Sequence, residues 1–396
     1  MPLGGRVEAV ERPDRLTRAM ASRRSVTVGN VTIGGGAPVV VQSMTTTKTH
    51  DVAATTQQIA ELASAGCEVV RVAVPKTEDA EALGRIVRFS PIPVIADIHF
   101  NASLALKAIE GGVHAVRINP GNIGGPEKVE LVVEAAKRAG IPMRIGANSG
   151  SLPRHLAELA QHDQAEALVE AALEEVRLLE RLDYFEFKIS VKSSHVPTMI
   201  RAYRMLAEKV PYPLHLGVTE AGTVYSGSIK SAVGIGTLLA DGIGDTIRVS
   251  LAADPVEEPR AAFEILKALG LRERGPIMIA CPSCGRDNVG VHTLAEEVER
   301  RLLAYPQHVE VAVLGCAVNG PGEAGDADFG IAGGRDVGFI YAHGRVLKKV
   351  SSAVLIDELF REIDRWIADG MHRPKRLKMA KPAALAMAEA SAIPLE

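Results

Sequence analysis

Three cysteines near the carboxyl end of the sequence stand where thiolates could bind iron or zinc. Cys281 and Cys284 are separated by two residues in CPSCGR, a spacing that lets two thiolates bind one metal centre. Cys316 ends the apolar run VEVAVLGC, and Glu323 follows after the turn sequence NGPG. Because both groups come at the end of a predicted strand, we expect them to meet in one site.

Spacing alone leaves three interpretations of these cysteines open. An iron–sulfur cluster held by three thiolates needs a further ligand, and Glu323 is the obvious carboxylate, a harder and more exchangeable ligand than a thiolate. A structural zinc would need a fourth Cys or His, but His292 and His308 are badly spaced for it. The third interpretation is thiols without a metal. Cys67, in AGCEVVRV, is predicted to be a small buried core residue.

Charged and polar side chains also gather where eight predicted strands end. The cations are Arg71, Arg117, Arg144, Lys192 and Arg248, accompanied by Asp97, His99, Asn119, Asn148, His215, Glu220 and Ser250. Charges within strands that are buried on both faces are costly unless they are paired or liganded. Each cation could pair with a carboxylate at the rim, but these strand ends supply few acids. Since the planar guanidinium grips phosphate oxygens in pairs, the surplus predicts a multiply charged anion such as a diphosphate.

Two further groups have candidate chemical roles at the same strand ends. Glu220, in GVTEAG, is a candidate proton donor or acceptor, and the alternative is an ion pair with Arg248. Asp97 and His99 are two residues apart on one predicted strand and therefore face the same side. Nothing nearby completes a set of metal ligands, so a positioning role is favoured for this pair.

The elements that would position these residues follow a repeating strand–helix pattern. Short β-branched runs alternate with helical runs that often end in Gly. The predicted strands are 39–45, 68–74, 93–100, 115–121, 142–150, 185–194, 213–222 and 245–253. Eight such units predict an α/β fold, a closed (β/α)8 barrel of the TIM type over residues 25–270. The alternative, an open doubly wound sheet, usually carries a Gly-rich fingerprint that is missing here. The hairpin-like segment 26–36 is predicted to close the bottom of the barrel.

The polar linker LRERGP separates the barrel from a different pattern. Residues 271–372 predict a small α+β domain that ends in an amphipathic helix. Residues 1–24 are interpreted as a flexible extension and residues 373–396 as a mobile tail. The net charge of −3 argues against a nucleic-acid or membrane-surface binder, and no apolar run reaches the length of a membrane span. A cytoplasmic location is expected, because the first residues fit neither a secretory signal nor a transit peptide.

Nine motifs, taken together, resemble the 4-hydroxy-3-methylbut-2-enyl diphosphate synthase family in its short bacterial form. They are VQSMTTTKT, ADIHFN, RINPGNIG, RIGANSGSL, KISVKSSHV, PLHLGVTEAG, GIGDTIRVSLAADPVEE, ACPSCGR and GCAVNGPGE. The resemblance runs in continuous order over roughly residues 25–370. It implies a TIM-type barrel joined to a 4Fe-4S domain similar to those of sulfite reductases.

The resemblance also assigns roles residue by residue. The implied cluster ligands are Cys281, Cys284, Cys316 and Glu323, and the implied diphosphate site is Arg71, Arg117, Arg144, Lys192, Arg248 and Ser250, with Asn148 nearby. Glu220 matches the acid/base glutamate of the family, and Asn319 would lie on the face of the cluster domain that meets the substrate. The implied reaction is the reductive ring opening and dehydroxylation of 2-C-methyl-D-erythritol 2,4-cyclodiphosphate, the penultimate step of a route to isoprenoids, with electrons from flavodoxin or ferredoxin.

The cluster and the barrel mouth must meet, although only a short linker joins the two domains. The resemblance implies a homodimer in which each small domain covers the barrel of its partner, and we expect the same here. Two other functions fit the residues alone. One is a non-redox barrel enzyme for a phosphorylated ligand whose small domain is stabilised by zinc. The other is a cluster-bearing electron carrier or iron sensor, which has no need for the strand-end cations.

Overall fold

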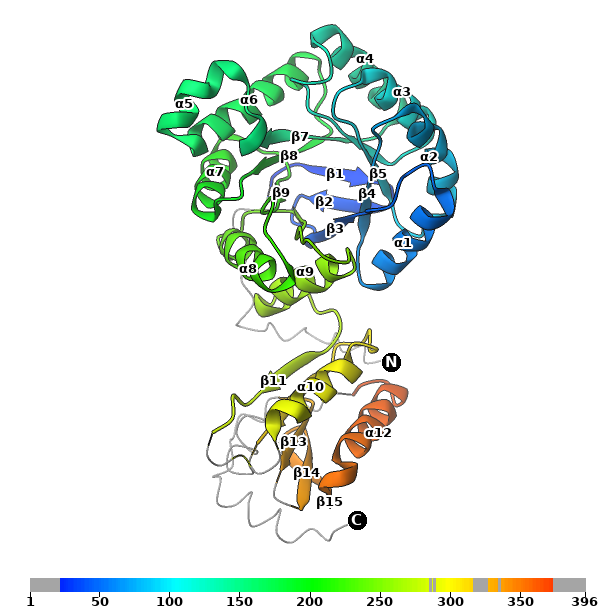
Figure 1. The fold of residues 1–396 in the computed structure, drawn as a ribbon, viewed down its shortest axis with the longest axis vertical. Coiled ribbons are helices and arrows are strands. Elements are labelled where there is room, and N and C mark those ends of the chain that lie inside the picture. The colour runs from blue at the N-terminus through cyan, green and yellow to red at the C-terminus, as the bar shows by residue number, and fades with distance from the viewer. Residues whose placement is uncertain (1–21, 285–286, 288–289, 316–326, 334–335, 373–396) are drawn as a thin grey trace, which may run out of the picture. The chain divides into compact units, whose positions relative to one another are not determined.

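The computed structural model describes residues 22–284, 287, 290–315, 327–333 and 336–372 of the 396-residue chain. Contacts divide the chain into two units, Met1–Arg272 and Glu273–Glu396, which are described separately below. Figure 1 shows that the first unit is a ring of strands surrounded by helices, and that the second contains a sheet with helices beside it.

The first unit is the predicted parallel barrel. Its eight-stranded sheet has the order β8-β7-β6-β5-β4-β3-β10-β9, and every neighbouring pair is parallel. A bridge between Ile189 and Leu214 joins its two ends and closes the barrel. The strands are β3 (Val40–Met44), β4 (Val69–Ala73), β5 (Val94–Asp97), β6 (Ala115–Arg117), β7 (Met143–Asn148), β8 (Phe187–Lys192), β9 (His215–Leu216) and β10 (Thr246–Ile247). The open-sheet alternative is therefore wrong.

A helix follows every barrel strand and covers its outer face (Figure 1). The helices are α1 (Val52–Ser64), α2 (Thr77–Phe89), α3 (Ala102–Glu110), α4 (Pro126–Ala139), α5 (Ala157–His162), α6 (Gln164–Arg181), α7 (Val196–Lys209), α8 (Val224–Ala240) and α9 (Glu257–Ala268). Local sequence sets their ends. In α4, Pro126 occupies the first turn, where its missing N–H costs nothing, and Gly140 caps the carboxyl end in the left-handed conformation.

An antiparallel hairpin closes the amino end of the barrel, as predicted. It consists of β1 (Ser25–Val28) and β2 (Val31–Gly34). Val26, Val28 and Ile33 are buried in one cluster with apolar residues from the amino ends of β3, β4, β5 and β6. Because this end is filled with apolar side chains, a ligand can reach the interior only from the carboxyl ends of the strands, where barrel enzymes carry their active sites.

The second unit has the predicted α+β architecture. Its sheet has the order β11-β12-β13-β14-β15, parallel in the first three strands and antiparallel in the last three. The strands are β11 (Ile277–Ala280), β12 (Glu310–Leu314), β13 (Phe329–Gly333), β14 (Val337–Ala342) and β15 (Arg345–Ser351), and the helices are α10 (Val291–Leu302) and α12 (Leu355–Ala368). Helix α12 packs Leu359, Phe360 and Ile363 against the sheet.

Among the described residues, none of the helices combines the length and apolar character needed to span a membrane. The cytoplasmic location stays a prediction. The extension 1–24, apart from residues 22–24, and the tail 373–396 lie outside the described residues.

Candidate active site in the barrel interior

The register of the barrel decides which side chains face its interior. Neighbouring strands pair Asp97 with Arg117 and Arg117 with Arg144, so these three side chains stand side by side. The next pairs along the ring are Arg144 with Lys188 and Asn148 with Lys192. The intervening strand residues, such as Val116 and Ile189, belong to the apolar core beneath the helices. The interior of this barrel is therefore lined with charged groups, where most barrels pack branched apolar residues.

Asp97 is the buried carboxylate that organises the first half of the ring. Its Oδ1 accepts a hydrogen bond from Nη1 of Arg117 at 3.1 Å, and its Oδ2 lies 3.4 Å from Nε of Arg71. His99 comes two residues after the end of β5, which is shorter than predicted, yet its Nε2 lies 2.7 Å from Nη1 of the same Arg117. The positioning role expected for Asp97 and His99 fits this geometry, and neither contacts a second carboxylate or a cysteine that could complete a metal site among the described residues.

Electrostatics at this group favour an ionised Asp97. Burial alone would raise the pKa of its carboxyl group, but Arg71, His99 and Arg117 hold that pKa far below its ordinary value. For Arg71 burial is the larger effect: it lowers the pKa of the guanidinium to about 10, although Asp97 acts in the opposite direction. One carboxylate thus neutralises only part of the positive charge around it.

Three further buried cations come from β7 and β8, and no carboxylate among the described residues forms an ion pair with them. Nε and Nη2 of Arg144 donate to Oγ of Ser190 at 3.2 and 3.0 Å, while its Nη1 has no hydrogen-bond partner among the described residues. Lys188 and Lys192 are 1% and 6% exposed. Burial, followed by repulsion from Arg144 and Arg71, lowers the pKa of Lys188 to about 7 and that of Lys192 well below its usual range.

Arg248 lies just after β10 and, among the described residues, forms a two-bonded ion pair with a carboxylate of its own. Its Nε and Nη2 donate to the two carboxylate oxygens of Glu258 on α9, each at 3.1 Å. Glu258 also accepts a hydrogen bond from Oγ of Ser43 at 2.7 Å. The alternative that Glu220 is the ion-pair partner of Arg248 is therefore wrong, because Glu258 occupies that place.

Glu220 lies on the exposed loop between β9 and α8, at the carboxyl rim of the barrel. It has a left-handed backbone conformation with φ of 52°, which is unusual for a residue with a side chain. No side-chain hydrogen bond or ion pair holds its carboxylate among the described residues, so the group is accessible from solvent. Asn148 at the end of β7 and Ser250 after β10 are partly buried at the same rim.

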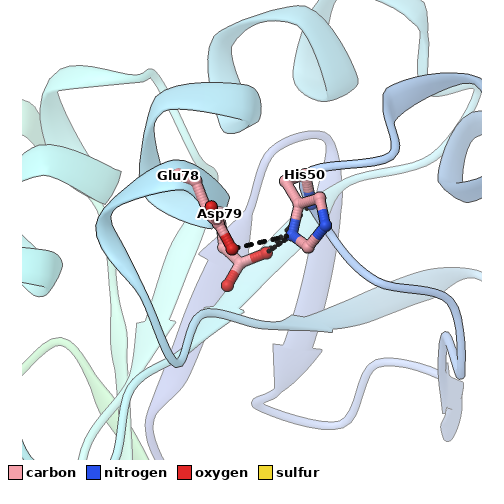
Figure 2. A group of neighbouring side chains, drawn as sticks. All are labelled: His50, Glu78 and Asp79. Carbon is pink, nitrogen blue, oxygen red and sulfur yellow. Dashed lines mark hydrogen bonds and ion pairs between the residues drawn. The ribbon is translucent and has the colours of Figure 1, made fainter.

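A second polar cluster holds the loop between β3 and α1 against helix α2. Figure 2 shows His50, Glu78 and Asp79 pointing toward one another. Oδ1 of Asp79 accepts from the backbone N–H of His50 at 3.0 Å and lies 2.9 Å from its Nδ1, while Oδ2 accepts from the backbone N–H of Lys76 at 3.2 Å. Because both oxygens of Asp79 already bond to backbone groups, we interpret this cluster as a structural clamp for the MTTTKTH loop.

The predicted metal ligands belong to the second unit and are described only in part. Cys281 follows β11 and is half-buried, with its backbone N–H donating to the carbonyl of Val313 in β12 at 2.9 Å. Cys284 is exposed. Cys316, Asn319 and Glu323 lie outside the described residues. The described residues of this segment fit a thiolate site. The CPSC loop follows β11, and the carboxyl end of β11 lies beside that of β12. Cys67, in contrast, is a buried core thiol, as predicted, and burial raises its pKa to about 12.

Sequence reasoning missed two residues of the barrel site. Lys188 was detectable, since FKISVK places it on the same strand face as Ser190 and Lys192. Glu258 was not, because it comes from a helix after the last strand, and only the closed ring brings it to Arg248.

These features define a class: a TIM-barrel protein whose interior carries an excess of buried cations, followed by an α+β unit with a cysteine pair. Family models then match both units, the GcpE TIM-barrel domain over residues 23–263 and the GcpE protein C-terminal domain over residues 277–365. The chain belongs to the GcpE family.

Named relatives match over nearly their whole length. A protein of Geobacter sulfurreducens is 56% identical over 349 residues, which is 88% of this chain and 99% of the relative; one of Geobacillus thermodenitrificans is 51% identical over 90% of this chain and 96% of the relative. Both are named 4-hydroxy-3-methylbut-2-en-1-yl diphosphate synthase (flavodoxin). Among solved structures, 3-dehydroquinate dehydratase from Geobacillus kaustophilus aligns with 63% of this chain and 96% of its own, at 15% identity and a TM-score of 0.45.

Proposed function

We propose that this chain catalyses the reductive ring opening and dehydroxylation of 2-C-methyl-D-erythritol 2,4-cyclodiphosphate, as a flavodoxin-dependent iron–sulfur oxidoreductase. The product is (E)-4-hydroxy-3-methylbut-2-enyl diphosphate. The reaction consumes two electrons and two protons, breaks one bond between carbon and phosphate oxygen, and releases one hydroxyl group as water. The observation that carries the proposal is the excess of buried cations over carboxylates in the barrel interior.

The diphosphate site comprises cations from five strands together with two polar groups at the rim. Its members are Arg71, Arg117, Arg144, Lys192, Arg248, Asn148 and Ser250. Asp97 and Glu258 orient three of these guanidiniums through the ion pairs described above, so the donors are set before the ligand arrives. The same cations balance the additional negative charge that develops on the diphosphate when the ring opens.

Glu220 is the candidate for proton transfer. It lies at the rim through which the ligand enters, and no side-chain partner in the described part of the chain occupies its carboxylate. A general acid or base must be free to reach the proton that it moves, and an unengaged carboxylate meets that requirement.

Cys281, Cys284, Cys316 and Glu323 are the proposed ligands of a 4Fe-4S cluster. A cluster of this kind, when bound, supplies the electrons one at a time. Support comes from the residues that are described: the two thiols of CPSC belong to one short loop, and β12, which leads into Cys316, pairs with β11. Flavodoxin is the proposed donor because the relatives carry it in their names; ferredoxin remains the second expectation.

A homodimer is proposed for the assembled enzyme. The residues that support it are apolar and exposed along one stripe of α8, at intervals of four: Tyr225, Ile229 and Val233 are 81%, 48% and 54% exposed. A stripe with this spacing is typical of a helix face that packs against another surface.

Anaerobic purification and assay test the proposed function. The protein should be brown, contain iron and acid-labile sulfide, bleach in air, and convert the cyclodiphosphate when supplied with reduced flavodoxin. Arg117→Ala and Arg248→Ala should lose most of this turnover, whereas Lys107→Ala on the outer helix α3 should retain it. A colourless protein that contains zinc would refute the redox function, and full turnover in both arginine variants would refute the substrate site.

A further inference from the structure

Lys188 lies deeper in the barrel than Lys192, the lysine of the proposed diphosphate site. In β8, Phe187, Ile189 and Val191 belong to the apolar core beneath the helices, so Lys188, Ser190 and Lys192 face the interior. Lys188 precedes Lys192 by four residues, or roughly 13 Å along the strand, toward the closed end of the barrel. Its backbone pairs with that of Arg144 on β7, so Lys188 lies beside Arg144 and below Lys192.

No protein group in the described part of the chain accepts a hydrogen bond from Nζ of Lys188. Nη1 of Arg144, Nε2 of His215 and the side-chain amide of Gln42 are likewise buried without partners there. Buried polar atoms nearly always have partners, so a group of exceptions calls for an explanation such as a bound ion or a functional role. Arg144 acts electrostatically on both Lys188 and His215, so these exceptions belong to one region of the interior.

The charges that act on Lys188 all oppose its protonation. Arg144 is its neighbour on β7, and Arg71 faces it from β4. The other titratable groups of the interior are Arg117 on β6, His215 on β9, Lys192 on β8, Arg248 after β10 and Asp97 on β5. The described carboxylates of this region are already engaged: Asp97 by Arg71 and Arg117, and Glu258 on α9 by Arg248. Glu175 on α6 accepts a hydrogen bond from the backbone N–H of Gly146. Burial and repulsion together lower the pKa of Lys188 to about 7, and burial lowers that of His215 as well.

We propose that Lys188 is a positioning residue that gains a proton when a diphosphate occupies the cations beside it, so that anion binding is coupled to proton uptake. The inference rests on the proposed function, which places the diphosphate there. An anion with two or more charges cancels the repulsion from the guanidiniums. The neutral amine then takes one proton from solvent and becomes an ammonium group. Ring opening frees a further phosphate oxygen, and the new ammonium charge compensates it without movement of the strands.

The coupling has a defined pH window. Below pH 7 the amine is protonated in both states, and binding takes up no proton at Lys188. Above pH 7 the free protein must acquire the proton, so affinity falls as pH rises, by up to about tenfold per pH unit for one linked proton. The window closes near pH 10, where the ordinary pKa of lysine is reached.

Calorimetric titration measures this proton uptake directly. The unreduced holoenzyme is titrated with inorganic pyrophosphate and, separately, with the cyclodiphosphate, at pH 8 in two buffers of different ionisation enthalpy. The variants are Lys188→Met, Lys188→Arg and, as a control, Lys107→Met. Since pyrophosphate itself titrates, the informative quantity is the difference in protons taken up between wild type and variant.

Wild type and Lys107→Met are expected to take up about one proton more per bound anion than Lys188→Met. Lys188→Arg keeps a permanent charge, and should bind with that uptake lost and with a weaker dependence of affinity on pH. Equal proton uptake in wild type and Lys188→Arg would overturn this inference alone, even if Lys188→Met failed to fold. A wild-type protein that bound neither anion would overturn the diphosphate site as well.

Discussion

At the scale of single residues, Asp97 is the carboxylate that balances two cations of the barrel interior. Asp97 fixes Arg71 and Arg117, and those two guanidiniums keep its pKa low. Asp97→Asn leaves both cations buried without a counter-charge. We expect the free energy of unfolding to fall by about 3–5 kcal/mol, the usual cost of removing one partner of a buried ion pair.

The pH dependence of that loss follows from the sign of the pKa shift. A carboxylate whose pKa is lowered in the folded state stabilises the fold at every pH above its ordinary value, and this contribution is lost as the pH falls below it. Denaturant unfolding of wild type and Asp97→Asn should therefore differ by the same amount at pH 5 and pH 8. Equal stability of the two proteins at pH 7 would contradict the role assigned to Asp97.

Lys188 predicts a pH dependence of the same sign in a higher pH window, but the opposite effect of substitution. Its folded pKa of about 7 lies below the ordinary 10.5, so the unfolded chain binds more protons between these values and stability rises with pH in that window. Lys188→Met removes the penalty and should be more stable than wild type by a few kcal/mol at pH 6, since each unit of pKa shift is worth about 1.4 kcal/mol. The gain should shrink at pH 9. Urea unfolding at both values tests this, and Lys107→Met should match wild type throughout.

At the scale of elements, the strand–helix alternation predicted all eight barrel strands and the closing hairpin. It overestimated their lengths, because β9 and β10 are only two residues long and Glu220, Arg248 and Ser250 lie beyond them in loops. A pattern of residue types locates a strand, but backbone pairing with both neighbours decides where it ends. For the same reason Glu258 escaped prediction: its partner is set by the closure of the ring.

Gly146 sets the spacing of β7 and β8, the strands that carry Arg144 and Lys188. Its φ is 137°, and a Cβ atom there would lie 1.9 Å from the carbonyl oxygen of Ser190. Its N–H donates at 2.7 Å to Glu175 of α6, whose pKa is raised to about 8 by burial. Gly146→Ala should therefore push the two strands apart, with a large loss of thermal stability or of soluble protein.

Gly150 provides the matched control for that substitution. It lies two residues after the end of β7, and a Cβ atom there would meet nothing within 4 Å. Gly150→Ala should have the melting temperature of wild type. A Gly146→Ala protein as stable as Gly150→Ala would show that the close approach of the two strands is not required.

At the scale of the whole molecule, we expect a homodimer whose interface includes the exposed apolar stripe of α8. Ile229→Asp places a charge at the centre of that stripe and should shift the protein from dimer to monomer in sedimentation measurements, with loss of turnover. Leu131→Asp is the control, because Leu131 is also exposed, at 57%, but lies on α4. A dimer that survives Ile229→Asp but not Leu131→Asp would place the interface elsewhere.

At the cysteine site, the sequence supplies the spacing of the candidate ligands and the structure supplies the pairing of the strands that carry them. Spacing in CPSCGR and GCAVNGPGE raised a cluster, zinc or bare thiols as alternatives, and residue patterns could not choose among them. The parallel pairing of β11 and β12 brings the segments that lead into both motifs together. Family membership supports the iron–sulfur interpretation, while the ligand set stays a proposal for the iron analysis described above.

The central claim is that the cations of the barrel interior bind the diphosphate of the substrate. Equilibrium binding of 2-C-methyl-D-erythritol 2,4-cyclodiphosphate to the unreduced holoenzyme tests it most directly, because no turnover intervenes. Arg117→Met should weaken binding by about tenfold to a hundredfold, the loss expected for one charge-assisted hydrogen-bonding group, while Lys107→Met should bind as wild type does. The same dissociation constant for wild type and Arg117→Met, in a variant that retains its fold, would contradict the account.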